Sequence, residues 1–197
     1  MKKIIIATKN KGKVKEFRSF FADHQIEVIS LLDLEEEIPD IEETGETFEE
    51  NAALKAEQIS NRFHQPVLAD DSGLIIDGLD GRPGLYSARY AGEPTNDQAN
   101  IDKVLEEMKD IPDEDRAARF ICVLAIARPG EETVFVKGYC EGHIQKEQTG
   151  ENGFGYDPIF VPEGYSKTMA ELSPSEKNEI SHRKQAMKQL EKRIHLL

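Results

Sequence analysis

The sequence predicts an α/β protein with a long mixed β-sheet flanked by helices, and two patterns lead to this prediction. The first is a βα start: apolar residues 4–7 form an expected buried strand, and a short polar loop and an amphipathic helix follow. The second is a pair of strand-like segments, residues 119–127 and 133–139, joined by a turn that contains Pro129 and Gly130, which is typical of a hairpin. Residues 119–127 are apolar on both faces, so this strand is expected at the centre of the sheet.

The length predicts one domain, residues 1–197, or two lobes that share a sheet, and the sequence contains no internal repeat or domain linker. A chain of this size buries about 70% of its unfolded surface and needs no disulfide support. Cys122 and Cys140 lie in strand-like runs without metal-ligand spacing, so we expect buried thiols of a cytoplasmic protein. The apolar run 4–7 is too short for an export signal, and no segment resembles a membrane span.

The composition is acidic, with 38 acidic and 25 basic residues and a net charge of -13. Residues 33–50 contain ten of the acids and no lysine or arginine. This balance disfavours nonspecific binding to nucleic acid or to anionic membranes, so we expect neither as a partner. It suits divalent cations, and polyanions that bind together with a cation.

The loop after the first strand is rich in lysine and contains Gly12. A strand, a short polar loop and a helix with Val14 and Phe17 on one face present backbone N–H groups and a helix N-terminus to an anion. The loop lacks the GxxxxGK[ST] pattern of a Walker A motif. The alternative is an ordinary turn with solvated lysines, which these residues alone favour.

A second strand is predicted at residues 26–32, and a helix follows the acidic segment. This helix carries a buried stripe that includes Phe48 and Ile59, and Thr47 with Glu50 forms a predicted capping box at its start. One or two acids just before this helix are expected to face Asp71.

The stretch VLADDSG at residues 67–73 carries two adjacent acids. We expect residues 67–69 to end a buried strand and a turn to follow at Gly73, with Asp70 and Asp71 on opposite faces. Acids in such a place often ligate a metal or accept a proton. The alternative is a turn that Asp70 or Asp71 caps through backbone hydrogen bonds.

Two loops combine glycines with aromatic residues. Residues 78–92 form the first, and Asn96 after it is a candidate cap for a further helix. Residues 150–158 form the second, before a strand at 159–161. In this second loop, rings beside exposed backbone suit stacking on a planar ligand, although a tight turn with core aromatics is an equal alternative.

The C-terminal region predicts a helix with one stripe from Ile180 to Ile194. A capping box at Ser173 offers one start, and a start nearer Glu179 is the alternative. A basic cluster near this start consists of Lys177, His182 and Arg183.

Together these parts describe a site for a purine nucleotide with Mg²⁺. The chain resembles the inosine/xanthosine triphosphate pyrophosphatase family, which hydrolyses non-standard purine nucleoside triphosphates. Five motifs in order carry the resemblance: ATKNKGKVKEF at 7–17, EETGETFEENAALKA at 42–56, ADDSGLIIDGLDGRPGLYSARYAG at 69–92, GFGYDPIF at 153–160, and AELSPSEKNEISHR at 170–183.

The resemblance implies a role for each matching residue. Glu43 and Asp71 would hold Mg²⁺, with Glu42 the alternative to Glu43, and Asp71 would also accept a proton. The residues implied to bind substrate are Thr8, Lys9, Asn10, Lys11, Gly12 and Lys13 at the triphosphate, Ser72 beside the catalytic acid, Phe154, Gly155, Tyr156 and Asp157 at the base, and Lys177, His182 and Arg183 as further contacts, at least some of them to the purine.

The resemblance also implies the reaction, the assembly and a cleft between two lobes. Water would attack the α-phosphorus of ITP, dITP or XTP and release the monophosphate and pyrophosphate, in a homodimeric enzyme. A base pocket rich in N–H donors would favour the 6-oxo group of these purines over the 6-amino group of adenine. The alternatives are a Maf-like pyrophosphatase for other nucleotides and a nucleotide sensor without turnover.

Overall fold

The structure is a computed structural model that describes residues 2–36 and 38–197. Met1 and Glu37, which belong to the predicted domain and to the acidic segment, lie outside the described residues. The chain divides into two compact units. The first consists of Met1–Asp71, Val123–Lys137 and Ala186–Leu197, and the second of Ser72–Cys122 and Gly138–Gln185. The prediction of a single domain stays a prediction.

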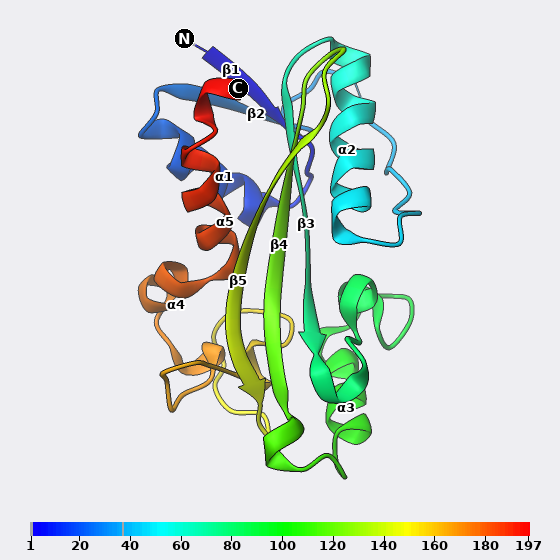
Figure 1. The fold of residues 1–197 in the computed structure, drawn as a ribbon, viewed down its shortest axis with the longest axis vertical. Coiled ribbons are helices and arrows are strands. Elements are labelled where there is room, and N and C mark those ends of the chain that lie inside the picture. Colours follow the sequence, from blue (N-terminus) through cyan, green and yellow to red (C-terminus); the bar gives the residue numbers. More distant parts are fainter. Residues whose placement is uncertain (1, 37) are drawn as a thin grey trace. The chain divides into compact units, whose positions relative to one another are not determined.

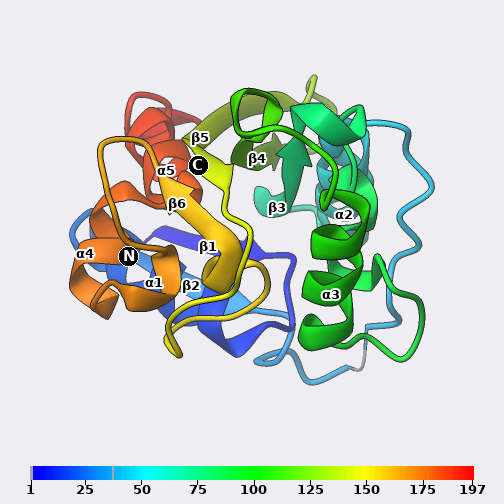
Figure 2. The same ribbon diagram turned by 90° about the horizontal axis from the view of Figure 1, so that it is seen from below.

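The sheet has six strands in the order β2-β1-β3-β4-β5-β6 (Figures 1 and 2). Their bounds are β1 Lys2–Ile6, β2 Ile26–Ser30, β3 Val67–Ile76, β4 Ala117–Ala127, β5 Val134–Ile144 and β6 Phe160–Pro162. β1 pairs in parallel with β2 and with β3, whereas β5 and β6 are antiparallel. The sheet is therefore mixed, as the sequence predicts, and the neighbouring strands β4 and β5 confirm the predicted hairpin segments.

In the first unit, apolar strand residues and amphipathic helices form the core. Ile4 and Ile6 of β1 are fully buried, and α1 (Lys11–Ala22) contacts β2 with Phe17 and Phe21 buried. The helix α2 (Phe48–Phe63) runs beside β3 in both views (Figures 1 and 2). Apolar spacing of 3.6 residues explains why one face of each helix is buried.

In the second unit, α3 (Asp97–Glu107) packs its buried residues Ile101 and Val104 into an apolar cluster with side chains of β4, β5 and β6. Asn96 caps α3 by accepting a hydrogen bond from the Ala99 N–H, as predicted. The same unit contains α4 (Pro174–Ile180), and α5 (His182–Glu191) begins in it.

The predicted strand end and turn at residues 67–73 are wrong. β3 continues to Ile76, so Asp70 and Asp71 lie inside the strand and do not cap a turn. Both acids are buried, with 2% and 9% of their surface exposed. The strand continues because a lysine neutralises each carboxylate, and a buried charge is tolerated only when it is paired.

Two predictions about helix ends also need correction. The stripe from Ile180 to Ile194 is not one helix, because Ser181 adopts an extended conformation that separates α4 from α5. The start at Ser173 with its capping box is confirmed. At α2, Thr47 caps as predicted, but the Glu50 carboxylate accepts from the Glu46 N–H, so that only half of the predicted box forms.

Candidate functional site

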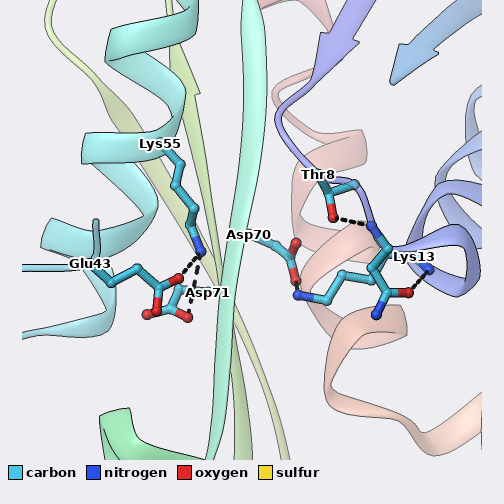
Figure 3. A network of polar contacts seen from close by, with 7 residues as sticks. Thr8, Lys13, Glu43, Lys55, Asp70 and Asp71 are labelled. Carbon is cyan, nitrogen blue, oxygen red and sulfur yellow. Dashed lines mark hydrogen bonds and ion pairs between the residues drawn. The ribbon is translucent and has the colours of Figure 1, made fainter. Parts of the chain in front are cut away.

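The loop between β1 and α1 is fixed by its own polar side chains. The Asn10 carboxamide oxygen accepts the Lys13 N–H at 3.0 Å, and the Asn10 N–H donates to the Thr8 hydroxyl at 3.1 Å (Figure 3). Asn10 is the N-cap, so Lys11, Gly12 and Lys13 form the first turn of α1. The N–H groups of a first turn have no acceptor within the helix and attract anions.

The lysines of this loop point to different partners. The Lys13 ammonium lies 2.7 Å from the carboxylate of Asp70, whose side chain is 1% exposed. Lys9 pairs with the exposed Asp40 at 2.7 Å, and Lys11 is exposed. Of the predicted lysines, Lys13 is therefore the one held against β3, where its charge can reach a bound anion.

Asp71 lies on the other face of β3 and shares a lysine with Glu43. The Lys55 ammonium is 2.7 Å from the Glu43 carboxylate and 3.7 Å from that of Asp71 (Figure 3). The predicted opposite orientation of Asp70 and Asp71 is thereby confirmed. Glu42 is exposed, so Glu43 is the acid that the fold brings near Asp71.

Lys55 is the residue of this cluster that the sequence reasoning missed. It follows the buried Ala52 by three positions and precedes the buried Ile59 by four, so it falls on the apolar stripe of α2. A lysine in such a stripe is the signal that could have identified it. Burial alone would lower the pKa of Lys55, but Asp71, Asp70 and Glu43 outweigh it and raise this pKa, so the ammonium stays charged.

Glu43 is positioned by the turn that leads into α2. The Gly45 N–H donates to the side-chain oxygen of Asn51 at 2.8 Å, and Asn51 is 2% exposed. A Cβ at Gly45 would lie 2.7 Å from that oxygen, so this close approach requires glycine. The spacing of Gly45 and Asn51 in the motif thus fixes the segment that carries Glu43.

In the second unit, the glycine-rich loop is built around the buried Asp157. Its carboxylate accepts the Phe154 N–H at 3.0 Å and forms an ion pair with Lys177. A Cβ at Gly153, which has a φ of 81°, would lie 2.0 Å from the carboxylate. The Lys177 ammonium also lies 4.5 Å from the centre of the Phe154 ring, a cation–π contact.

The sequence left two alternatives for the aromatic residues of this loop, stacking on a ligand or packing in the core. Each alternative holds for one of the two residues. Phe154 is 66% exposed and can stack on a planar ligand, whereas Tyr156 is 5% exposed and belongs to the core. The Tyr156 hydroxyl donates to the Ser87 carbonyl at 2.6 Å. Tyr156 therefore anchors the loop while Phe154 presents its ring.

The predicted cluster of Lys177, His182 and Arg183 is divided between two helices. Lys177 lies in α4, and His182 and Arg183 begin α5. The His182 ring stacks on Phe120 with centroids 5.2 Å apart, and Arg183 is 5% exposed. Ser72, half-buried on β3, is the first residue of the second unit.

The described residues, 2–36 and 38–197, contain no group of three or more histidine, cysteine, aspartate or glutamate side chains suited to a metal ion. None of the helices in these ranges is both long and apolar enough to span a membrane.

Comparison with solved structures defines the fold class first. The chain matches "The structure of the Staphylococcus aureus Ham1 protein" with a TM-score of 0.91 and 46% identity over 98% of both chains. It matches "Structure of a HAM1 protein from Coxiella burnetii" with a TM-score of 0.93 and 43% identity over 100% of both. The α/β fold with its flanked mixed sheet is thus that of these proteins.

The sequence comparisons identify the family. The Ham1 family model matches residues 4–193, and the chain belongs to the Ham1 family. A relative from Oceanobacillus iheyensis, 74% identical over 100% of both chains, is named dITP/XTP pyrophosphatase. One from Halalkalibacterium halodurans, 60% identical over 98% of both chains, has the same name. The resemblance derived from the five motifs is confirmed.

The ion pair of Asp157 leads to a prediction about pH. Burial raises the pKa of Asp157 above its ordinary value of 3.8, although Lys177 and the Phe154 N–H oppose this. The folded protein then binds this proton more tightly than the unfolded chain does. The contribution of Asp157 to stability is therefore fully present below pH 3.8 and is lost as the pH rises through the raised folded pKa.

We expect the free energy of unfolding of the wild type, minus that of Asp157→Asn, to fall as the pH rises across this window. This difference is measured by urea unfolding, monitored by circular dichroism, at a series of pH values. Asp102→Asn, at an exposed carboxylate of α3, is the matched control. A difference that does not change with pH would contradict the prediction.

Proposed function

We propose that this protein is a nucleoside triphosphate pyrophosphatase that hydrolyses ITP, dITP and XTP to the monophosphate and pyrophosphate. The observation that carries the proposal is the 74% identity, over the full length, to a relative named dITP/XTP pyrophosphatase. The charged groups of the first unit and the exposed ring of the second unit support it. The name of that relative favours purine triphosphates over the substrates of a Maf-like enzyme.

The loop at Thr8–Lys13 would bind the triphosphate. A triphosphate carries about four negative charges at neutral pH, which the N–H groups of a helix start and lysine side chains offset. Lys13 and the first turn of α1 supply these groups, and Asn10 holds the turn in place. Lys13 would then exchange its contact with Asp70 for one with phosphate.

Glu43 and Asp71 would hold Mg²⁺. Both are oxygen ligands, and the Lys55 ammonium already lies within 4 Å of both carboxylates, which fits a place for a cation. Two carboxylates suffice, because Mg²⁺ in nucleotide enzymes keeps waters and binds substrate phosphates as well. When bound, Mg²⁺ would neutralise phosphate charge and acidify a coordinated water.

Asp71 would also accept the proton of the attacking water. The water oxygen bonds to the α-phosphorus, the bond from this phosphorus to the bridging oxygen breaks, and pyrophosphate leaves with the electron pair. Lys55, once released from Glu43, would place its charge beside the phosphates. This scheme needs no covalent intermediate.

The base would be recognised in the second unit. Phe154 would stack on the purine, and the Lys177 ammonium beside it is a donor suited to a 6-oxo group. Adenine would turn its 6-amino donor toward this ammonium and leave both donors without an acceptor. Such mismatches discriminate by orders of magnitude.

A substrate panel tests the reaction and its specificity. We expect pyrophosphate from dITP and XTP, and little product from ATP or dTTP, in assays with Mg²⁺ that detect pyrophosphate and phosphate separately. Guanine also carries a 6-oxo group, so low turnover of dGTP would have to depend on its 2-amino group. Asp71→Asn should lower kcat by roughly 10²–10⁴-fold, as is typical for loss of a proton acceptor. Asp102→Asn is the control for the substitution.

Three results would contradict this scheme. Phosphate in place of pyrophosphate would exclude the reaction. Preference for dTTP would favour the Maf-like alternative. Tight binding of dITP without any product would favour the sensor.

The position of Lys55 predicts an effect on metal binding without nucleotide. Because its ammonium competes with a metal ion for Glu43, Lys55→Met should tighten Mg²⁺ or Mn²⁺ binding by about tenfold, or 1.4 kcal/mol. The same variant should lower kcat, because a charge beside the phosphates is lost. Titration calorimetry of the protein alone measures the affinity.

Lys15→Met, at an exposed position of α1, is the matched control and should leave metal affinity unchanged. Equal affinity of Lys55→Met and the wild type would contradict this competition between the ammonium and a metal ion at Glu43.

We further propose a cytoplasmic homodimer. Phe135 and Tyr139 lie on one face of β5 and are 37% and 43% exposed, which supports an interface there. Cys122 and Cys140 are buried and form no disulfide, which suits a reducing compartment. Light scattering should give twice the chain mass of 22.2 kDa. A monomer at micromolar concentration, or recovery of the protein outside the cytoplasmic fraction, would contradict these proposals.

A further inference from the structure

Residues 153–157, called the base loop below, are held by carboxylates at two successive peptide groups. The Phe154 N–H donates to Asp157, three residues away, and the Gly155 N–H donates to Asp97 at 2.8 Å, 58 residues away. Gly153 and Gly155 have φ values of 81° and 58°, so the loop does not form a regular element that would fix it. Side-chain contacts must therefore fix its backbone.

Asp97 is well placed to do this because it is the first residue of α3, a helix whose start is rigid. Asn96 caps the helix, and Ile101 anchors it in the core. Asn100, 2% exposed, accepts the Ala91 N–H at 2.7 Å and donates to the Ala88 carbonyl at 3.1 Å. The first turn of α3 is thus bound to a neighbouring loop and provides a fixed point for the Asp97 carboxylate.

The base loop makes a third contact, with Ser87. This residue lies in the same segment as Ala88 and Ala91, which Asn100 binds. The Tyr156 hydroxyl donates to the Ser87 carbonyl, and the Ser87 hydroxyl accepts the Leu74 N–H at 2.9 Å. Residues 154, 155 and 156 are therefore each bound by a different group. Of these groups, the Asp97 carboxylate belongs to an exposed residue of another element, α3. Asp97 can therefore be substituted without disturbing the packing of the core.

These contacts matter for Phe154 because its ring is 66% exposed and has little packing to hold it. The direction of the ring follows from the backbone on either side of it. On that backbone the Gly155 peptide is oriented by Asp97, and the Phe154 peptide by Asp157. Loss of either hydrogen bond would let the ring occupy more orientations, which lowers affinity for a planar ligand.

We propose that Asp97 is a positioning residue for base recognition: it holds the Gly155 peptide so that Phe154 is preorganised to stack on the purine. This inference rests on the proposed function of the base loop. Asp97 acts through the loop and need not touch the nucleotide. Its effect is therefore expected on substrate affinity and not on the chemical step.

Asp97→Ala tests this through kinetics. It should raise KM for dITP and XTP by about tenfold, the equivalent of one hydrogen bond of about 1.4 kcal/mol, with kcat changed by less than about twofold. Inhibition by tripolyphosphate, which has no base, should be unchanged. Asp97→Asn keeps a side-chain oxygen as acceptor and should restore most of the lost affinity. Asp102→Ala, at another exposed carboxylate of α3, is the matched control.

Amide hydrogen exchange of the free protein gives a second readout that needs no substrate. Exchange at Gly155 should be faster in Asp97→Ala than in the wild type, Asp97→Asn and Asp102→Ala. Unchanged KM in Asp97→Ala, or equal weakening of tripolyphosphate inhibition, would overturn the inference even if exchange is faster. Failure of the proposed function looks different, because the wild type itself would then release no pyrophosphate from dITP or XTP.

Discussion

Two adjacent carboxylates in a buried strand are the constraint on which the first unit depends. Asp70 and Asp71 lose hydration inside β3, and this cost is offset because Lys13 from α1 and Lys55 from α2 approach them from opposite faces. The alternation of side chains along a strand sends each acid to its own lysine. Two helices are thereby tied to one strand through charges that the proposed triphosphate and metal sites would also use.

The same pairing explains how a strongly acidic chain can bind a polyanion. Each lysine is held beside an acid in the free protein, so it is placed before the substrate arrives and its charge is balanced. In the proposed scheme, binding exchanges partners: phosphate would replace Asp70 at Lys13, and a metal ion would replace the Lys55 ammonium at Glu43. Such an exchange avoids leaving a buried charge without a partner, which costs far more than a changed contact.

The second unit solves a different problem, that of presenting an exposed ring in a defined direction. Glycines give the base loop a path that brings its backbone against the Asp157 carboxylate. The buried Tyr156 anchors one end, and Asp97 holds the middle. Phe154 can remain exposed for a ligand because its neighbours in the chain are fixed by hydrogen bonds and not by packing of the ring itself.

The sequence by itself determined the features that depend on local interactions. The apolar stripes gave the helix faces, the caps at Asn96 and Ser173 gave helix starts, and strand alternation separated Asp70 from Asp71. Tertiary structure alone decided the length of β3, the approach of Lys55 to Glu43 and the contact of Asp97 with Gly155. β3 continues through two acids because distant lysines neutralise them. The apolar stripe of α2 marks Lys55 as a lysine that needs an acid, but no local pattern records which acid it meets.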